Sequence, residues 1–243
     1  MKKKSRIHFA HKSTQMNLAR HLPNALTSAN LICGCLGIIA VFSYPVEAAY
    51  FIWAACFFDF LDGFVARLLK VSSPIGKELD SLADMVSFGV LPTMAMFRWM
   101  DINADAGWMP YLAIMIAVFS ALRLAKFNID ERQSDSFIGV PTPANALFIT
   151  ALVFLPESLI SLVFTGPVLA GITIIFSLLL VAPINLFALK FKNFGWRGNE
   201  VRFTFLALAV FLLVILQAGA LPFIILSYII ISLVSRVLGV EKN

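Results

Sequence analysis

The chain has 243 residues, of which 60% are hydrophobic and only 14% are charged, and its formal net charge is +5. A soluble globular domain holds about 25% charged residues, so this composition excludes an ordinary water-soluble globule. The apolar residues gather in stretches of about 17 to 25 residues, the length a helix needs to cross a hydrocarbon core. The sequence therefore predicts an all-α, polytopic bundle of membrane helices.

The first predicted element is a basic amino-terminal segment at 1–22, which opens MKKKSRIHFAHK. It leads into no short apolar run with a small-residue cleavage site, so we expect it to be retained and not removed as a signal peptide. Residues 5–22 mix basic and apolar side chains, a pattern typical of a short interfacial helix in the headgroup layer. A disordered basic tail is the alternative for its first part.

Eight membrane spans are predicted after this segment. They lie at 24–44, 47–70, 78–99, 108–127, 142–163, 166–190, 202–218 and 220–238. With a cytoplasmic amino terminus, 18 of the 19 basic residues fall in cytoplasmic segments and helix ends, and only Arg98 falls at an outer end. The positive-inside rule therefore predicts that both termini are cytoplasmic.

Four aspartates stand in the segment DFLDGFVARLLKVSSPIGKELDSLAD, residues 59–84. Asp59 and Asp62 are three residues apart and Asp80 and Asp84 are four apart, so each pair lies on one helix face. The polar stretch between the pairs turns the chain, which makes the second and third spans antiparallel neighbours. All four carboxylates are then expected at a similar depth, near the cytoplasmic surface.

Acids within a membrane are costly, and each indicates a functional site with a partner. Four carboxylates in a small volume cannot all stay ionised without a counter-charge. Hard divalent cations with oxygen ligands, Mg²⁺ or Mn²⁺, are the natural solution, and two such ions would clamp a phosphoryl group. The small residues Gly63 and Ala66 beside the acids would let a ligand or a neighbouring helix approach the backbone.

This segment resembles the signature D-x2-D-G-x2-A-R-x8-G-x3-D-x3-D of the CDP-alcohol phosphatidyltransferases. The matching positions are Asp59, Asp62, Gly63, Ala66, Arg67, Gly76, Asp80 and Asp84. The resemblance implies transfer of a phosphatidyl group from CDP-diacylglycerol to an alcohol, with release of CMP. It implies that Asp59, Asp62 and Asp80 are metal ligands, and that Asp84 is both a ligand and the general base for the acceptor hydroxyl.

The resemblance also implies a domain division and a donor site. The division is a basic segment at 1–22, a six-helix catalytic core at 23–200 and two additional spans at 201–243. The residues expected to bind CDP-diacylglycerol are Thr27, Asn30, Asp62, Gly63, Ala66, Arg67 and Gly76. Thr27 and Asn30 would hydrogen-bond the cytidine or its ribose, although helix capping and packing are the alternative for both.

Three further stretches bear on the acceptor: LPNALTSANLICG at 22–34, ALRLAKFN at 121–128 and FIGVPTPAN at 137–145. Together they resemble the bacterial and archaeal phosphatidylserine synthases of this superfamily, which implies L-serine as the acceptor. Arg123, Lys126 and Asn128 would bind a donor phosphate or the serine carboxylate. The alternative is that Arg123 and Lys126 only extend to the membrane interface.

Other functions remain open. Glycerol 3-phosphate and inositol phosphate are rival acceptors within the same enzyme class, and an ion-coupled transporter that uses the acids as a relay is the alternative from another class. Direct in-line attack without a covalent enzyme intermediate is expected. The resemblance further implies a homodimer. The distribution of basic residues predicts a protein of the cytoplasmic (inner) membrane with its active site near the cytoplasmic face, and nothing in the sequence points to nucleic acid.

Overall fold

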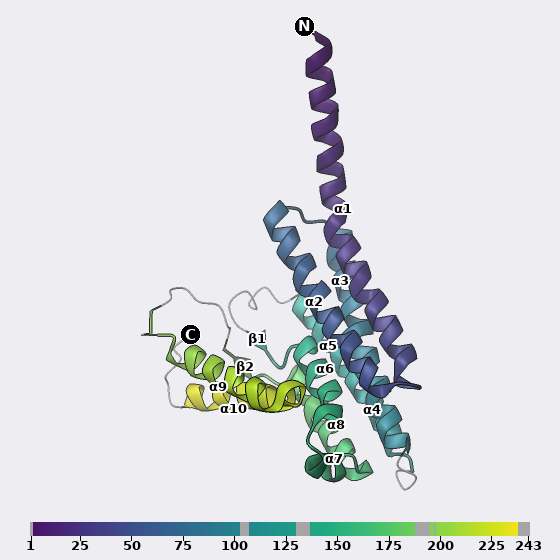
Figure 1. Cartoon of the computed structure of the whole chain (residues 1–243), viewed down its shortest axis with the longest axis vertical. Helices are drawn as coiled ribbons and strands as arrows, with labels where there is room; N and C mark the ends of the chain where they lie inside the picture. Colours follow the sequence, from purple (N-terminus) through teal and green to yellow (C-terminus); the bar gives the residue numbers. More distant parts are fainter. Residues whose placement is uncertain (1, 103–106, 130–136, 188–194, 197, 238–243) are drawn as a thin grey trace.

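The computed structural model describes residues 2–102, 107–129, 137–187, 195–196 and 198–237 (Figure 1). Its α-helices are α1 (Lys2–Val41), α2 (Pro45–Leu69), α3 (Pro74–Asp84), α4 (Leu91–Ile102), α5 (Ile114–Ile129), α6 (Thr142–Ala151), α7 (Glu157–Val163), α8 (Gly166–Val181), α9 (Glu200–Leu216) and α10 (Ala220–Val237). Shorter elements are the π-helix η1 (Met85–Val90), the 3₁₀ turns η3 (Met109–Ala113), η5 (Leu152–Phe154) and η6 (Gln217–Gly219), and the strands β1 (Phe137–Ile138) and β2 (Asn185–Leu186).

The predicted class, a polytopic helical membrane protein, is confirmed. Four described stretches are long and apolar enough to cross a membrane, His21–Val41, Val46–Leu69, Met109–Ile129 and Glu200–Val237. A fifth arises if Thr142–Phe154 and Glu157–Val163, which meet at 117°, count as one span. By length and composition, the described residues therefore support four or five membrane spans, and the count of eight stays a prediction.

The differences from the predicted spans have local causes. The predicted span at 78–99 is divided among α3, η1 and α4, because a π-helical turn interrupts it directly after Asp84. The predicted span at 142–163 bends at Pro156, whose ring cannot continue a helix. The predicted span at 166–190 ends early, since α8 stops at Val181 before Pro183.

The first three helices form the part of the fold that carries the aspartates. The helix expected at 5–22 is present as the beginning of α1, which continues through Pro23 to Val41 and projects beyond the bundle (Figure 1). Helix α1 packs against both α2 and α3, whereas α2 and α3 make few contacts with each other. The two helices predicted to be antiparallel neighbours therefore pack mainly on α1, and only slightly on each other.

The turn between α2 and α3 is specified by its residues. Lys70 ends α2 in the left-handed conformation, with φ of 53°, and Ser73 caps α3 by accepting a hydrogen bond of 3.0 Å from the Gly76 amide. Pro74 follows the cap at the first helical position, where its missing N–H costs nothing. The turn thus directs α3 back along α1.

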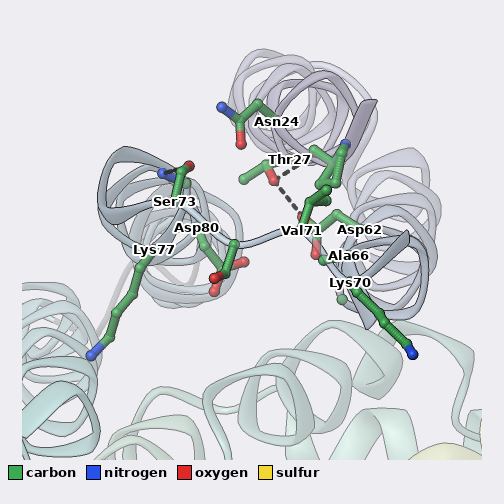
Figure 2. A pocket seen from close by; sticks show the side chains of 13 residues that line it. Asn24, Thr27, Asp62, Ala66, Lys70, Val71, Ser73, Lys77 and Asp80 are labelled. Carbon is green, nitrogen blue, oxygen red and sulfur yellow. Dashed lines mark hydrogen bonds between the residues drawn. The ribbon is translucent and has the colours of Figure 1, made fainter. Parts of the chain in front are cut away.

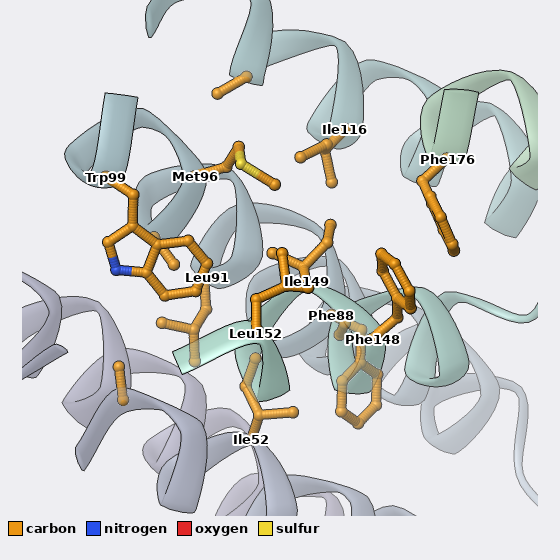
Figure 3. Close-up of a cluster of buried hydrophobic side chains, with 14 of the residues drawn as sticks. Ile52, Phe88, Leu91, Met96, Trp99, Ile116, Phe148, Ile149, Leu152 and Phe176 are labelled. Carbon is orange, nitrogen blue, oxygen red and sulfur yellow. The ribbon is translucent and has the colours of Figure 1, made fainter. Parts of the chain in front are cut away.

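A buried apolar layer joins η1 to α5, α6 and α8. Phe88, Ile116 and Ile149 are fully buried in it, and Phe148 stacks on Phe176 with ring centroids 3.7 Å apart (Figure 3). The backbone before α6 is tied to the end of α8 by the Val140 amide, which donates to the Leu179 carbonyl at 3.0 Å. These contacts position the start of α6 beside α8.

The last two helices run in a different direction from most other helices of the bundle (Figure 1). Figure 1 shows α9 and α10 side by side, running across the long axis of the bundle, and the chain reverses between them at Gln217, where φ is 48°. Tyr228 of α10 donates a 2.7 Å hydrogen bond to the Phe187 carbonyl, which links this hairpin to the segment after α8. The two predicted terminal spans are thus two helices, and their crossing of a membrane stays a prediction.

Candidate active site

Three carboxylates converge where α2 faces α3. Asp59, Asp62 and Asp80 each offer an oxygen, and these oxygens all lie within 4.8 Å of one another. Asp62 is buried, and the other two are half-buried. In the described part of the chain no ion pair neutralises any of them. A hard divalent cation fits this donor set, because it prefers carboxylate oxygens and supplies the missing positive charge.

Helix α1 holds two of the four aspartates by hydrogen bonds. Thr27 Oγ1 donates to Asp62 Oδ2 at 2.6 Å, and Asn30 Nδ2 donates to Asp84 Oδ1 at 3.1 Å. Both donors are buried. Within the protein both side chains bond aspartates, and Thr27 Oγ1 also lies 3.0 Å from the Pro23 carbonyl oxygen. The contact of Thr27 and Asn30 with the cytidine or its ribose stays a prediction.

A cavity of about 620 Å³ opens beside the carboxylates. Figure 2 shows Asp62 and Asp80 directed into it from α2 and α3, with Asn24 and Thr27 of α1 on another side. Its lining comprises Pro23, Asn24, Thr27, Asp62, Gly63, Ala66, Lys70, Val71, Ser72, Ser73, Gly76, Lys77 and Asp80. Five of the seven predicted donor residues line the cavity, and Asn30 and Arg67 do not.

Four more residues line the cavity, although the sequence analysis did not predict that they bind the donor: Asn24, Lys70, Ser73 and Lys77. Their positions in the sequence could have indicated this. Asn24 lies three residues before Thr27 on one helix face, and the other three belong to the turn between the two aspartate pairs. A turn that closes a site between two helices contributes its own side chains to that site.

The two glycines of the signature serve different neighbours. A Cβ added at Gly63 would meet only the Arg67 guanidinium, at 3.5 Å or more. A Cβ added at Gly76 would come within 2.9 Å of both Asn24 Oδ1 and Ser73 Oγ. Gly76 is therefore required by the close approach of α3 to α1, whereas Gly63 leaves space toward the cavity.

Asp84 lies beside the three-carboxylate cluster and not within it. Its electrostatic neighbours include Asp59, Asp80 and Arg123, but no basic side chain in the described part of the chain forms an ion pair with it. It is the last residue of α3, and the π-helical turn η1 begins immediately after it. A π-turn shifts the direction of the side chains that flank it and is frequent at functional sites.

The three residues predicted to bind serine or a phosphate occupy different environments. Arg123 is buried, its Nε has no hydrogen-bond partner, and its guanidinium lies 5.8 Å from the centre of the Phe127 ring. Lys126 is exposed. Asn128 joins α5 to α3, since its Nδ2 donates to Ser81 Oγ at 2.8 Å and its carbonyl accepts from Lys77 Nζ at 2.9 Å.

This arrangement of carboxylates, cavity and interrupted third helix defines a class. Residues 20–182 match the CDP-alcohol phosphatidyltransferase family, and the chain belongs to it. The resemblance seen in the aspartate segment is thereby confirmed.

Individual relatives are more specific. The chain is 40% identical over 136 residues to the CDP-diacylglycerol–serine O-phosphatidyltransferase of Helicobacter pylori strain J99, which covers 55% of this chain and 57% of the relative. It is 36% identical over 139 residues to the Bacillus subtilis protein of the same name, covering 55% and 76%. The Methanocaldococcus jannaschii protein of that name is 37% identical over 124 residues, covering 51% and 56%. The match thus spans little more than half the length of the Helicobacter relative.

Proposed function

We propose that this protein transfers the phosphatidyl group of CDP-diacylglycerol to the hydroxyl of L-serine and releases CMP. The observation that carries the proposal is the cluster of Asp59, Asp62 and Asp80 at the cavity, with Asp84 held beside it by Asn30. The printed names of the relatives support the donor and the acceptor.

Asp59, Asp62 and Asp80 would hold two divalent ions, Mg²⁺ or Mn²⁺, with Asp84 as a further ligand at the edge. When bound, such ions neutralise charge on a pyrophosphate and make CMP a better leaving group. Thr27 has a second role in this arrangement, because its hydrogen bond fixes the orientation of Asp62.

The donor would lie in the cavity between α1, α2 and α3. Gly63 and Ala66 leave room for it on α2, and Gly76 sets the width of the cavity by allowing α3 close to α1. Lys70 and Lys77 line the same space and offer positive charge to phosphate oxygens. Arg67, exposed beside Gly63, is placed to approach the donor from the rim, and Asn30 acts through Asp84.

Asp84 would take the proton of the acceptor hydroxyl as the hydroxyl oxygen attacks the phosphorus. One P–O bond forms to the serine oxygen, the P–O bond to CMP breaks, and CMP leaves with the bonding electron pair. A carboxylate that accepts one hydrogen bond from Asn30 keeps lone pairs for the substrate proton. The direct in-line course needs no enzyme nucleophile.

The charge available inside the protein favours serine over phosphate-bearing acceptors. Arg123 is the one buried basic residue in the described part of the chain, and it lies on the Asp84 side of α5. A single guanidinium can neutralise one carboxylate. The phosphate of glycerol 3-phosphate or inositol phosphate is a dianion, and its neutralisation requires more basic groups. Lys126 and Asn128 would then act at the entrance.

The remaining features of the proposal concern the membrane and assembly. The chain would lie in the cytoplasmic membrane with both termini in the cytoplasm, as the distribution of basic residues supports, and with the cavity open on that side. Eight spans, the division at 22/23 and 200/201, and a homodimer belong to the same proposal.

The test is CMP release from CDP-diacylglycerol by purified protein with Mg²⁺ or Mn²⁺, with L-serine, glycerol 3-phosphate or inositol phosphate as the acceptor. We expect release that depends on serine. Release with another alcohol alone would refute the acceptor and keep the enzyme class. Absence of release with every alcohol, from folded protein loaded with metal, would refute the class as the activity of this chain.

A further inference from the structure

Among the residues that the structure describes, five buried side chains on α5, α6 and α8 carry polar atoms without a hydrogen-bond partner. These side chains, which we call the acceptor cluster, are Ser120, Arg123, Thr142, Asn145 and Ser177. Four of them are 0% exposed and Arg123 is 7% exposed. Both polar atoms of the Asn145 amide are unpaired. Buried polar groups in native proteins are nearly always paired, so five neighbours in this state require an explanation.

Elsewhere the same fold satisfies its buried hydroxyls. Thr93, Thr150 and Thr173 are each buried, and each donates to the carbonyl four residues earlier in the chain, at 2.8, 2.7 and 2.8 Å. Thr142 and Ser177 belong to the same two helices as Thr150 and Thr173, yet their hydroxyls have no partner. Of the unpaired buried polar atoms among the described residues, all but Asn30 Oδ1 and Trp53 Nε1 belong to α5, α6 and α8.

Helix α5 brings Ser120 and Arg123 beside the segment that follows Asp84. Asn128 bonds Ser81, and a Cβ at Gly89 would lie 3.3 Å from Ser120 Cβ. The chain advances eight residues from Ser81 to Gly89 while α5 goes back eight from Asn128 to Ser120. This constant antiparallel register places Arg123 next to the turn after Asp84, in agreement with the electrostatic interaction between the two.

Helices α6 and α8 bring the other three members of the acceptor cluster to the same side of the apolar layer as Arg123. Phe148 and Phe176 stack in the apolar layer shown in Figure 3. Asn145 and Thr142 precede Phe148 by one and about two turns, and Ser177 follows Phe176 directly. Phe88 of the same layer lies one turn beyond Asp84. The acceptor cluster therefore lies on the Asp84 side of this layer.

We propose that the acceptor cluster binds a small zwitterionic amino acid, with its hydroxyl directed at Asp84. This rests on the proposed function and deepens it, by assigning Ser120, Thr142, Asn145 and Ser177 to recognition of the acceptor.

The chemistry of the five side chains matches such a ligand. The Arg123 guanidinium and the Thr142 hydroxyl at the amino end of α6 donate to the carboxylate. The ammonium donates to Asn145 Oδ1 and to the hydroxyl oxygens of Ser120 and Ser177. Both charges of the ligand are then paired in the protein interior, and each of the five side chains gains a hydrogen-bond partner.

The first test is the KM for L-serine, measured by CMP release, in Thr142→Val, Ser177→Ala and Asn145→Ala. Loss of a hydrogen bond to a charged ligand group should raise this KM about tenfold to a hundredfold. The KM for CDP-diacylglycerol should change less than about twofold. Thr150→Val and Thr173→Val are the matched controls, because they remove buried hydroxyls of the same helices that are already paired.

The second test needs no turnover. L-serine should raise the thermal unfolding midpoint of the wild-type protein, and it should raise that of Thr142→Val and Ser177→Ala much less. Without serine, these two variants should unfold at the wild-type temperature or above it, since each removes an unpaired buried group. These substitutions therefore keep the test meaningful even where Asn145→Ala does not fold.

The outcomes separate the two proposals. An unchanged KM for serine and an unchanged serine-dependent shift in Thr142→Val and Ser177→Ala would overturn the acceptor cluster, which would then hold structural water, and leave the reaction standing. A serine-dependent shift that these variants lose, in a protein that releases no CMP, would support the cluster and overturn the proposed function.

Discussion

The aspartate site and the acceptor cluster differ in how their polar groups are paired. The aspartate site on α2 and α3 is held by hydrogen bonds from α1, Thr27 to Asp62 and Asn30 to Asp84. The unpaired atoms of the acceptor cluster have no such partners among the residues that the structure describes. The first site is shaped by the protein before any ligand arrives, whereas the second has donors and acceptors that only a ligand or water can satisfy. The difference suggests that the donor side is preorganised and that acceptor binding completes the other side.

The largest effect should come from removal of a metal ligand. Asp80→Asn, or chelation of divalent ions from the wild type, should lower CMP release by about a thousandfold or more, because the charge on the pyrophosphate is then unopposed. Release and Mn²⁺ binding are the measurements. Asp101→Asn is the control, since that acid is exposed and paired with Arg98. Wild-type activity in Asp80→Asn would show that the aspartate site is not the catalytic site.

Asp84→Asn separates the two roles given to Asp84. Loss of the general base should lower kcat by about a hundredfold to ten-thousandfold. Mn²⁺ binding should remain, because the Asp59, Asp62 and Asp80 oxygens already form a group without it. Loss of metal binding together with activity would make Asp84 a principal ligand and would leave the identity of the base open.

Asn30→Ala tests the preorganisation of Asp84. Without the 3.1 Å hydrogen bond the carboxylate can rotate, so kcat should fall about tenfold while the KM for CDP-diacylglycerol stays near the wild-type value. Ser28→Ala is the control on the same helix, since Ser28 bonds only the Asn24 carbonyl. A raised KM for the donor with unchanged kcat would indicate that Asn30 contacts the cytidine, as expected from the sequence, and does not orient Asp84.

The smallest effects should distinguish the two signature glycines. Gly76→Ala places a methyl group 2.9 Å from Asn24 Oδ1 and Ser73 Oγ, and it should lower the free energy of unfolding by about 1–3 kcal/mol. Gly63→Ala meets only the flexible Arg67 side chain, so stability should be unchanged and the KM for the donor should rise a few-fold. Thermal unfolding and donor titration measure the two. Equal stability of both variants would contradict the packing role of Gly76.

The sequence by itself determined the class of this protein and its aspartate site. Long apolar stretches identify membrane helices because length and hydrophobicity are local properties. The spacing of Asp59, Asp62, Asp80 and Asp84 along two helices likewise defines which faces they share. The family signature was readable for the same reason, since all of it lies within residues 59–84.

Only the tertiary structure decided the partners of those residues. Thr27 and Asn30 bond aspartates, Arg123, Lys126 and Asn128 occupy different environments, and buried polar atoms of Ser120, Asn145 and Ser177 on three helices have no partner among the described residues. The bend at Pro156 and the π-helical turn after Asp84 also divided two of the expected spans. Whether a buried polar group finds a partner depends on how helices pack across the bundle, and spacing within one helix does not contain that information.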